Sequence, residues 1–321
     1  MTPMVLEDVD SAGPVSFEVR LPGPLDVVIS LEPFRRSGDD LMDRWDGTHL
    51  MRTIPVGNAS IAYACTVGGT LRAPKLGVTI EDSTWIDAVK RVVGSTFVPA
   101  PPDFAALLER DPIIAELNRR FPGLRPVLQF DLLGALVRSI SAQQVNLRWA
   151  ATTRRRLAEA FGKRHLVAGH PVYSLSATRL AAASVEEIRA LQFTTRKAEY
   201  IIGVAQAIAD GHLDTQSLAV LPDDEVISRL TALRGIGLWT AEWILTRTLG
   251  RPRVVAGDLG VRKVVGMAYL RSPLASEAEV RKATAHWGAS AGIAQALLLH
   301  SLIGAPRVRD ASGGSSHPKR D

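Results

Sequence analysis

The sequence predicts an α+β fold, in which a small N-terminal domain on an antiparallel sheet precedes an all-helical region. Short, β-branched, partly alternating stretches are confined to the first hundred residues, and a proline-rich segment follows them. Apolar residues then recur at spacings of three and four almost to the end of the chain. With 46% hydrophobic and 22% charged residues, the 321-residue chain has enough apolar material for a folded core.

The N-terminal domain is expected over residues 1–98. A helical pattern at Ser83–Val93 follows four strand-like stretches, which are Val15–Leu21, Met51–Val56, Ala59–Val67 and Lys75–Ile80. The segment Thr96–Asp103 contains three prolines in eight residues and cannot continue a helix. We therefore place the domain boundary within this segment.

The helical region is expected over residues 99–304, and residues 305–321 are polar and rich in glycine and serine, which predicts a disordered tail. Helical patterns are found at Leu132–Ala142, Leu147–Phe161, Val185–Leu191, Lys197–Ala209, Asp224–Leu233, Trp239–Leu249 and Ala291–Ile303.

Composition excludes several classes of protein. No apolar run reaches the roughly 18–20 residues of a membrane span, and the acidic start is unlike a secretory signal, so we expect a soluble, cytoplasmic protein. The single cysteine, Cys65, excludes a disulfide scaffold and an iron–sulfur cluster, and the histidines lack metal-binding spacing. The net charge of +5 favours polyanions such as nucleic acid, although many enzymes that never touch DNA carry a similar excess. We expect Arg154–Arg156 to form a solvated helix face.

Thr231–Leu249 predicts two helices joined by a tight turn, within a helix-hairpin-helix at residues 224–249. Gly235 and Gly237 can adopt positive φ and allow a phosphate to approach the amides of the turn. The second helix adds its unpaired N–H groups and the positive end of its dipole. The same turn is also an ordinary way to join two antiparallel helices.

An acid follows the hairpin at Asp258, 21 residues beyond Gly237. Aspartate before the apolar run Leu259–Val265 is a favoured helix N-cap. A carboxylate near the hairpin could also act chemically, and the two roles are compatible.

The motifs LRGIGLWTAEWIL and VVAGDLGVRK resemble those of the helix-hairpin-helix DNA glycosylases, and most of all the bacterial 3-methyladenine DNA glycosylase II family, the AlkA type. Leu133–Val145 resembles the helix that leads to the family's minor-groove loop, and Leu191–Ala209 resembles the helix before its hairpin. The resemblance extends from Asp131 to Gly266 and more weakly into the N-terminal domain. It implies a two-lobed helical core that encloses a cleft, with the hairpin on one wall and Asp258 at its floor.

The activity implied by the resemblance is that of a monofunctional DNA glycosylase of base excision repair. It would flip alkylated purines of the 3-methyladenine and 7-methylguanine type out of duplex DNA and leave an abasic site. Asp258 would stabilise the oxocarbenium-like transition state. Bifunctional members carry a lysine at the position of Trp239, so the tryptophan predicts no strand cleavage.

The resemblance assigns DNA contacts to the hairpin and the minor-groove loop. The amides of Gly235 and Gly237, aided by Thr240, would grip one phosphate. Gln144 falls at the wedge position, where the AlkA type carries leucine, and would fill the gap left by the flipped base. Alternatively, Gln144 is a polar residue at a helix end that faces solvent.

Trp239 and Trp243 lie four residues apart on the second helix, hence on one face. They would line the base pocket and attract an alkylated purine by stacking and cation–π interaction, or they pack in a core. The AlkA type adds a tryptophan from its C-terminal helices, for which this chain offers Ile293 or a small neighbour. Trp287 is the nearby aromatic residue and has no assigned place in the pocket.

The resemblance implies no required cofactor, but a structural sodium or potassium ion held by the main-chain carbonyls of Thr231, Leu233 and Ile236. The implied partner is damaged double-stranded DNA, bound by a monomer at the bacterial nucleoid. Two alternatives remain, namely a noncatalytic DNA-binding or damage-sensing protein and a glycosylase for another lesion such as hypoxanthine or etheno bases. A buried acid beside the hairpin argues against the first, because binding alone would gain nothing from it.

Overall fold

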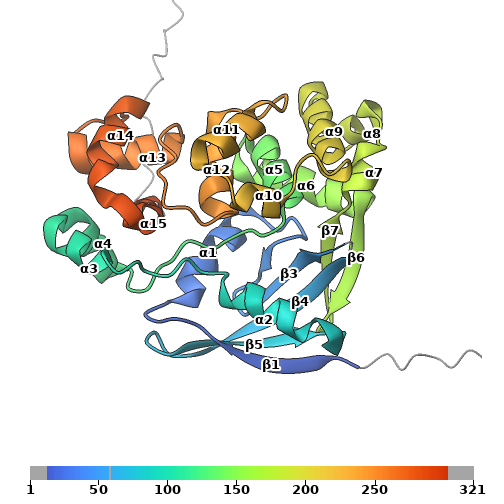
Figure 1. The fold of residues 1–321 in the computed structure, drawn as a ribbon, viewed down its shortest axis with the longest axis horizontal. Helices are drawn as coiled ribbons and strands as arrows, with labels where there is room; N and C mark the ends of the chain where they lie inside the picture. The colour runs from blue at the N-terminus through green and yellow to red at the C-terminus, as the bar shows by residue number, and fades with distance from the viewer. Residues whose placement is uncertain (1–12, 58, 303–321) are drawn as a thin grey trace, which may run out of the picture.

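A five-stranded antiparallel sheet lies on one side of the protein and helices cover the other in the computed structural model, which describes residues 13–57 and 59–302 (Figure 1). The strand order is β1–β5–β4–β3–β2. The bounds are β1 Val15–Arg20, β2 Arg44–Trp45, β3 His49–Val56, β4 Ala59–Gly69 and β5 Pro74–Ile80. The four expected strands are present with ends shifted by at most two residues, and the α+β fold class is confirmed.

Alternation of side chains gives the sheet a buried face. Leu76, Val78 and Ile80 of β5 are buried, and α2 (Ile86–Gly94) packs on the same core through Val89 and Val93. The expected helix at 83–93 begins as a 3₁₀ turn, η1 (Ser83–Trp85).

The one cysteine lies within this core. Cys65 on β4 is 1% exposed, and burial raises the pKa of its thiol to about 12.

The helices form two further cores. The first joins strand β7 His170–Leu175 with α5 Leu132–Ala142, α6 Leu147–Phe161, α7 Ala177–Ala181, α8 Val185–Ala190, α9 Thr195–Ala209, α10 Thr215–Ala219, α11 Asp223–Thr231 and α12 Leu238–Arg247. The second joins α3 Phe104–Arg110, α4 Pro112–Arg120, α13 Leu259–Val265, η2 Gly266–Leu270, α14 Glu277–Thr284, η3 Ala285–Ser290 and α15 Ala291–Ser301. Among residues 13–57 and 59–302, no helix combines the length and the apolar character needed to cross a membrane.

A β-hairpin interrupts the region that was expected to be all helical. Strands β6 (Gly162–Val167) and β7 (His170–Leu175) follow α6 and run beside the large sheet (Figure 1). Val167 and Val172 pack there against Met51 and Ala64. The hairpin thus ties the first helical core to the N-terminal sheet. The predicted tail at 305–321 and the acidic first residues lie outside the described residues.

Helix α1 (Val27–Ser37) connects all three parts of the molecule. It begins after Asp26, whose carboxylate accepts a hydrogen bond from the amide of Ile29 at 3.0 Å. Leu31 packs in the sheet core, whereas Ile29 packs against the second helical core. The last turn of α1 reaches the cleft described below.

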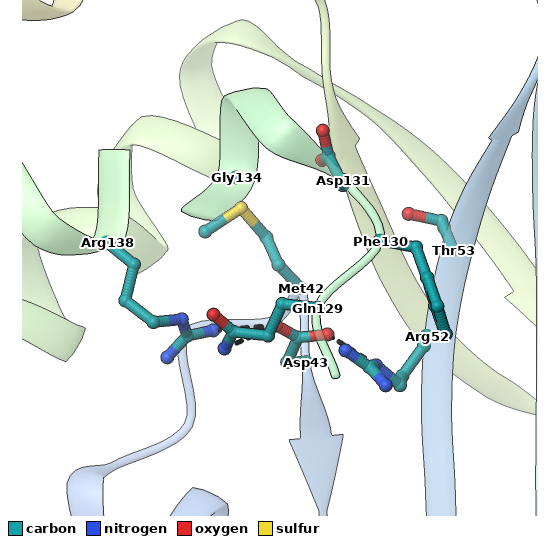
Figure 2. A pocket seen from close by; sticks show the side chains of 9 residues that line it. All are labelled: Met42, Asp43, Arg52, Thr53, Gln129, Phe130, Asp131, Gly134 and Arg138. Atoms are coloured by element: carbon teal, nitrogen blue, oxygen red, sulfur yellow. Dashed lines mark hydrogen bonds and ion pairs between the residues drawn. The ribbon is translucent and has the colours of Figure 1, made fainter. Parts of the chain in front are cut away.

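Five charged residues join the N-terminal domain to α5 and α6, and we call Asp40, Asp43, Arg52, Arg138 and Arg154 the junction cluster. Asp40, Arg52 and Arg154 are buried, and Asp43 and Arg138 are half-buried. Arg154 pairs with Asp40 at 2.8 Å, Arg52 pairs with Asp43 at 2.6 Å, and Arg138 contacts Asp40 at 2.9 Å and Asp43 at 3.0 Å. Figure 2 shows Arg52 and Arg138 on either side of Asp43, around a small cavity. Because Arg154 is 2% exposed, the expectation of a solvated basic face is wrong at this residue.

Burial alone would raise the pKa of Asp40, but the charges of Arg138 and Arg154 outweigh it and lower the pKa to about 2. Asp131, on the rim of the same cavity, forms no ion pair within residues 13–57 and 59–302, and burial raises its pKa to about 6 against the weaker attraction of Arg52.

Candidate DNA-binding and base-binding site

A cleft of about 1090 Å³ lies between the two helical cores. Its walls come from the end of α1, the end of α5 with the following loop, α12, residues 257–260 and Leu299 of α15. Four sequence-predicted site residues from distant parts of the chain line it together, namely Gln144, Trp239, Trp243 and Asp258.

Asp258 is held in place by both of its carboxylate oxygens. As the N-cap of α13, its Oδ1 accepts a hydrogen bond from the amide of Val261 at 3.1 Å. Its Oδ2 accepts one from the indole Nε1 of Trp239 at 3.0 Å. The capping role expected from the sequence is confirmed, and the same contacts fix a half-buried carboxylate at the cleft wall.

Trp239 and Trp243 are half-buried and line the cleft, and neither belongs to the first core that α12 helps to form. The edge of Trp239 is engaged with Asp258, as described above. A further aromatic ring, Phe34 at the end of α1, lines the cleft from the N-terminal domain. No sequence pattern pointed to this residue, because no helix or strand was expected between Leu21 and Met51.

The two glycines of the hairpin have different structural roles. Gly235 has φ +86°, and a Cβ there would lie 2.2 Å from the ring of Tyr200. Gly237 has an ordinary φ of −98°, so the positive φ that glycine permits is used at Gly235 and not at Gly237. A Cβ at Gly237 would meet nothing within 4 Å, and no side chain caps the N-terminus of α12. An anion can therefore approach the amides of the first turn of α12 at Gly237.

Thr240 does not fit its expected role. It is 1% exposed, because it faces the interior on the first turn of α12. Its hydroxyl is thus out of reach of a phosphate, and the expected contact is wrong.

Gln144 follows the end of α5 with φ +57° and lies exposed at the cleft. Its neighbour Gln143 donates from Nε2 to the carbonyl of Gly235 at 3.0 Å. Lys197 donates to the carbonyl of Ser141 at 2.8 Å. These bonds fix the loop that carries Gln144 against the hairpin.

The C-terminal helices do not supply the pocket residue suggested by the sequence. Ile293 is buried in the second helical core, so the expectation that it faces the base is wrong. Trp287 lies in the same core, and its indole donates to Asp111 at 3.3 Å. Leu299 is the residue of α15 that reaches the cleft.

The proposed cation ligands lie around the hairpin turn. The carbonyl of Leu233 accepts a hydrogen bond from the amide of Ile236 at 3.1 Å, which closes the turn. Neutral carbonyl oxygens at a helix C-terminus suit a hard monovalent ion, so the donor set is compatible with sodium or potassium. In the described part of the chain, no three histidine, cysteine or acidic side chains form a metal-binding group.

In a comparison with known protein families, residues 137–289 match the family described as "HhH-GPD superfamily base excision DNA repair protein". The chain is 33% identical over 156 residues to a DNA-3-methyladenine glycosylase of Bacillus subtilis (strain 168), a match that covers 46% of this chain and 50% of the relative. It is 32% identical over 138 residues to DNA-3-methyladenine glycosylase 2 of Escherichia coli (strain K12), which covers 42% and 47%. The chain thus spans about half the length of these curated relatives.

Solved structures agree with the fold. The 3-methyladenine DNA glycosylase from Archaeoglobus fulgidus superposes with a TM-score of 0.79 at 21% identity, covering 90% of this chain and 99% of that one. A DNA-3-methyladenine glycosidase from Bacillus halodurans gives a TM-score of 0.51 at 25% identity, covering 64% and 90%.

Proposed function

We propose that this chain, which carries an HhH-GPD superfamily domain at residues 137–289, is a monofunctional DNA glycosylase that releases alkylated purines from duplex DNA. The observation that carries the proposal is the carboxylate of Asp258. It is fixed by Val261 and Trp239 beside two tryptophans and the open N-terminus of α12. A protein that only bound DNA would have no use for a carboxylate held in this way near a phosphate site.

The reaction follows from this arrangement. The amides at Gly237 hold a phosphate of the damaged strand, and Gln144 enters the duplex as the target nucleotide leaves the stack. The flipped base stacks on Trp243 in the cleft. Asp258 then stabilises the positive charge that develops on the sugar as the glycosidic bond breaks, and water completes the hydrolysis.

The proposed reaction requires neither a general acid nor a nucleophilic amine. A purine alkylated at a ring nitrogen already carries a positive charge, so it departs without general-acid assistance. In the part of the chain that the structure describes, no lysine lines the cleft, which leaves no amine to form a Schiff base with the sugar. A monovalent cation on the carbonyls of Thr231, Leu233 and Ile236 would add positive charge near the bound phosphate.

The test is base release from methylated duplex DNA by wild type and Asp258→Asn, with a chelator present and with free bases and strand breaks resolved separately. We expect wild type to release 3-methyladenine or 7-methylguanine and to leave strands intact until alkali is added. Asp258→Asn should be slower by about 100-fold or more, because asparagine keeps the cap but not the charge.

Asp214→Asn is the matched control, since Asp214 also caps a helix, α10, through the amide of Ser217 at 2.8 Å. It should retain full activity. Equal activity of Asp258→Asn and wild type would overturn the role of the carboxylate. DNA binding without release of any base would identify a noncatalytic binder instead.

A further inference from the structure

A second pocket, which we call the linker pocket, lies where the N-terminal domain meets the helical region. It has a volume of about 80 Å³ and is formed by residues 21–25, Gly94, residues 97–100 and Arg125, which follows α4. Its walls are mostly apolar, and in the described chain Arg125 is the one charged residue that lines it. The linker pocket and the cleft share no lining residue in this part of the chain, so the two sites are separate.

The side chain of Arg125 is buried without an acid partner. It is 4% exposed, and its guanidinium carbon lies 5.5 Å from the centre of the Phe104 ring. Its Nη1 donates a hydrogen bond to the carbonyl of Leu124 at 2.8 Å. Within residues 13–57 and 59–302, no carboxylate pairs with the guanidinium, and its other four N–H donors have no acceptor. Burial lowers the pKa of Arg125, but a guanidinium keeps its charge at neutral pH.

The buried arginines of the junction cluster show what Arg125 lacks. Arg52 and Arg154 are 3% and 2% exposed, and each contacts an aspartate within 2.8 Å. A buried charge without such a partner is costly, because the protein interior does not replace the hydration that the charge loses. An anion in the linker pocket would supply both the counter-charge and the acceptor atoms for Arg125.

We propose that the linker pocket binds a small monocarboxylate anion, such as acetate, through the guanidinium of Arg125. A carboxylate pairs with a guanidinium through two parallel hydrogen bonds, and the methyl group of acetate suits the apolar walls at Leu21 and Phe97. The volume is sufficient for a molecule of this size, since one water molecule occupies about 30 Å³ in the liquid. Inorganic phosphate suits the pocket less well, because much of it is doubly charged at neutral pH and the pocket offers one positive charge.

The first test measures the melting temperature of the full chain in acetate, in acetamide and in sodium chloride at matched ionic strength. Acetamide has the shape of acetate without its charge. At about ten times the Kd obtained by calorimetric titration, acetate should raise the melting temperature by about 1–3 °C, and the other two should have almost no effect. Equal effects of acetate and acetamide would overturn the proposal. A larger effect of phosphate than of acetate would overturn the assignment of a carboxylate.

The second test removes the charge. Arg125→Met keeps an apolar stem of similar length and should weaken acetate binding at least 10-fold, while Arg125→Lys should retain part of it. Arg119→Met is the control for loss of a positive charge, because Arg119 is exposed on α4, pairs with Glu116 at 2.6 Å and does not line the pocket. It should bind acetate as wild type does. Unchanged binding in Arg125→Met would overturn the proposal.

Two readouts on wild type keep the proposal testable if the Arg125 variants do not fold. The Nε–Hε signal of Arg125 in the NMR spectrum, assigned through its own backbone amide, should shift with acetate and not with acetamide. Acetate should also slow proteolytic cleavage within residues 94–100, because these residues form one wall of the pocket. An unchanged Nε–Hε signal would overturn the proposal. Base release depends on the separate cleft, so its presence or absence does not affect any of these outcomes.

Discussion

The junction cluster and the cleft both contain buried or half-buried arginines, and Arg138 lines the cavities of both. In the junction cluster, Arg52, Arg138 and Arg154 each contact an aspartate within 3.0 Å. In the cleft, Arg247 stacks on Trp243 without such a partner. Pairing with an aspartate thus distinguishes the arginines of the junction cluster from Arg247 in the cleft.

Breaking a pair in the junction cluster should have the largest effect on stability. Asp40→Asn removes the charge that faces both Arg138 and Arg154, and it leaves a guanidinium that is 2% exposed without compensation. We expect the free energy of unfolding to fall by about 3–5 kcal/mol in urea denaturation. Asp39→Asn is the matched control, because Asp39 is exposed and pairs at 2.7 Å with a half-buried Arg44, and it should cost less than about 1 kcal/mol. If Asp40→Asn and Asp39→Asn lowered the free energy of unfolding equally, the buried pairs of the junction cluster would be no more important to stability than an exposed pair.

The same measurement on the cleft should give the opposite sign. Arg247→Met removes a charge that forms no ion pair in the part of the chain that the structure describes, and it keeps an apolar stem of similar length against Trp243. We expect it to raise the free energy of unfolding by about 1–2 kcal/mol, as is common where a binding site sacrifices stability. Arg154→Met should instead lower it by about 3 kcal/mol. A loss of stability in both variants would show that Arg247 supports the fold.

Asp131 should give the smallest effect and a distinctive pH dependence. Its pKa of about 6 lies above the ordinary value of 3.8, so the folded state binds the proton more tightly than the unfolded state. The contribution of Asp131 to stability is therefore greatest below about pH 4 and is lost as the pH rises through 6. Asp131→Asn should raise the free energy of unfolding by about 1 kcal/mol at pH 7 and by little at pH 4. If the difference in the free energy of unfolding between wild type and Asp131→Asn were the same at pH 4 and pH 7, the raised pKa of Asp131 would not be its cause.

Local patterns predicted the parts of the fold that depend on neighbouring residues. The alternation in β5 and the apolar spacing in α5 and α6 placed these elements within two residues of their bounds. The cap formed by Asp258 was also foreseeable, because capping involves residues three apart in sequence. The indole bond from Trp239 to Asp258 was not, since it joins residues that only the folding of the cleft brings together.

The elements that were missed owe their form to tertiary contacts. Strands β6 and β7 are short and partly polar, and packing of Val167 and Val172 on the large sheet stabilises them. Helix α1 contains Pro33, which weakens its helical signal, yet its burial against two cores overrides that preference. The burial of Arg154 and of Thr240 likewise depends on what packs over them, which no spacing along the chain encodes.

The position of Cys65 has a consequence for chemical durability. Alkylating agents react with thiolates, and a thiol with a pKa of about 12 in the core of the sheet supplies almost no thiolate at neutral pH. The one sulfhydryl of this chain is thus protected from the class of electrophile that would generate methylated purines in DNA. A protein built in this way can keep working in a cell under the same chemical attack that creates the substrates proposed for it.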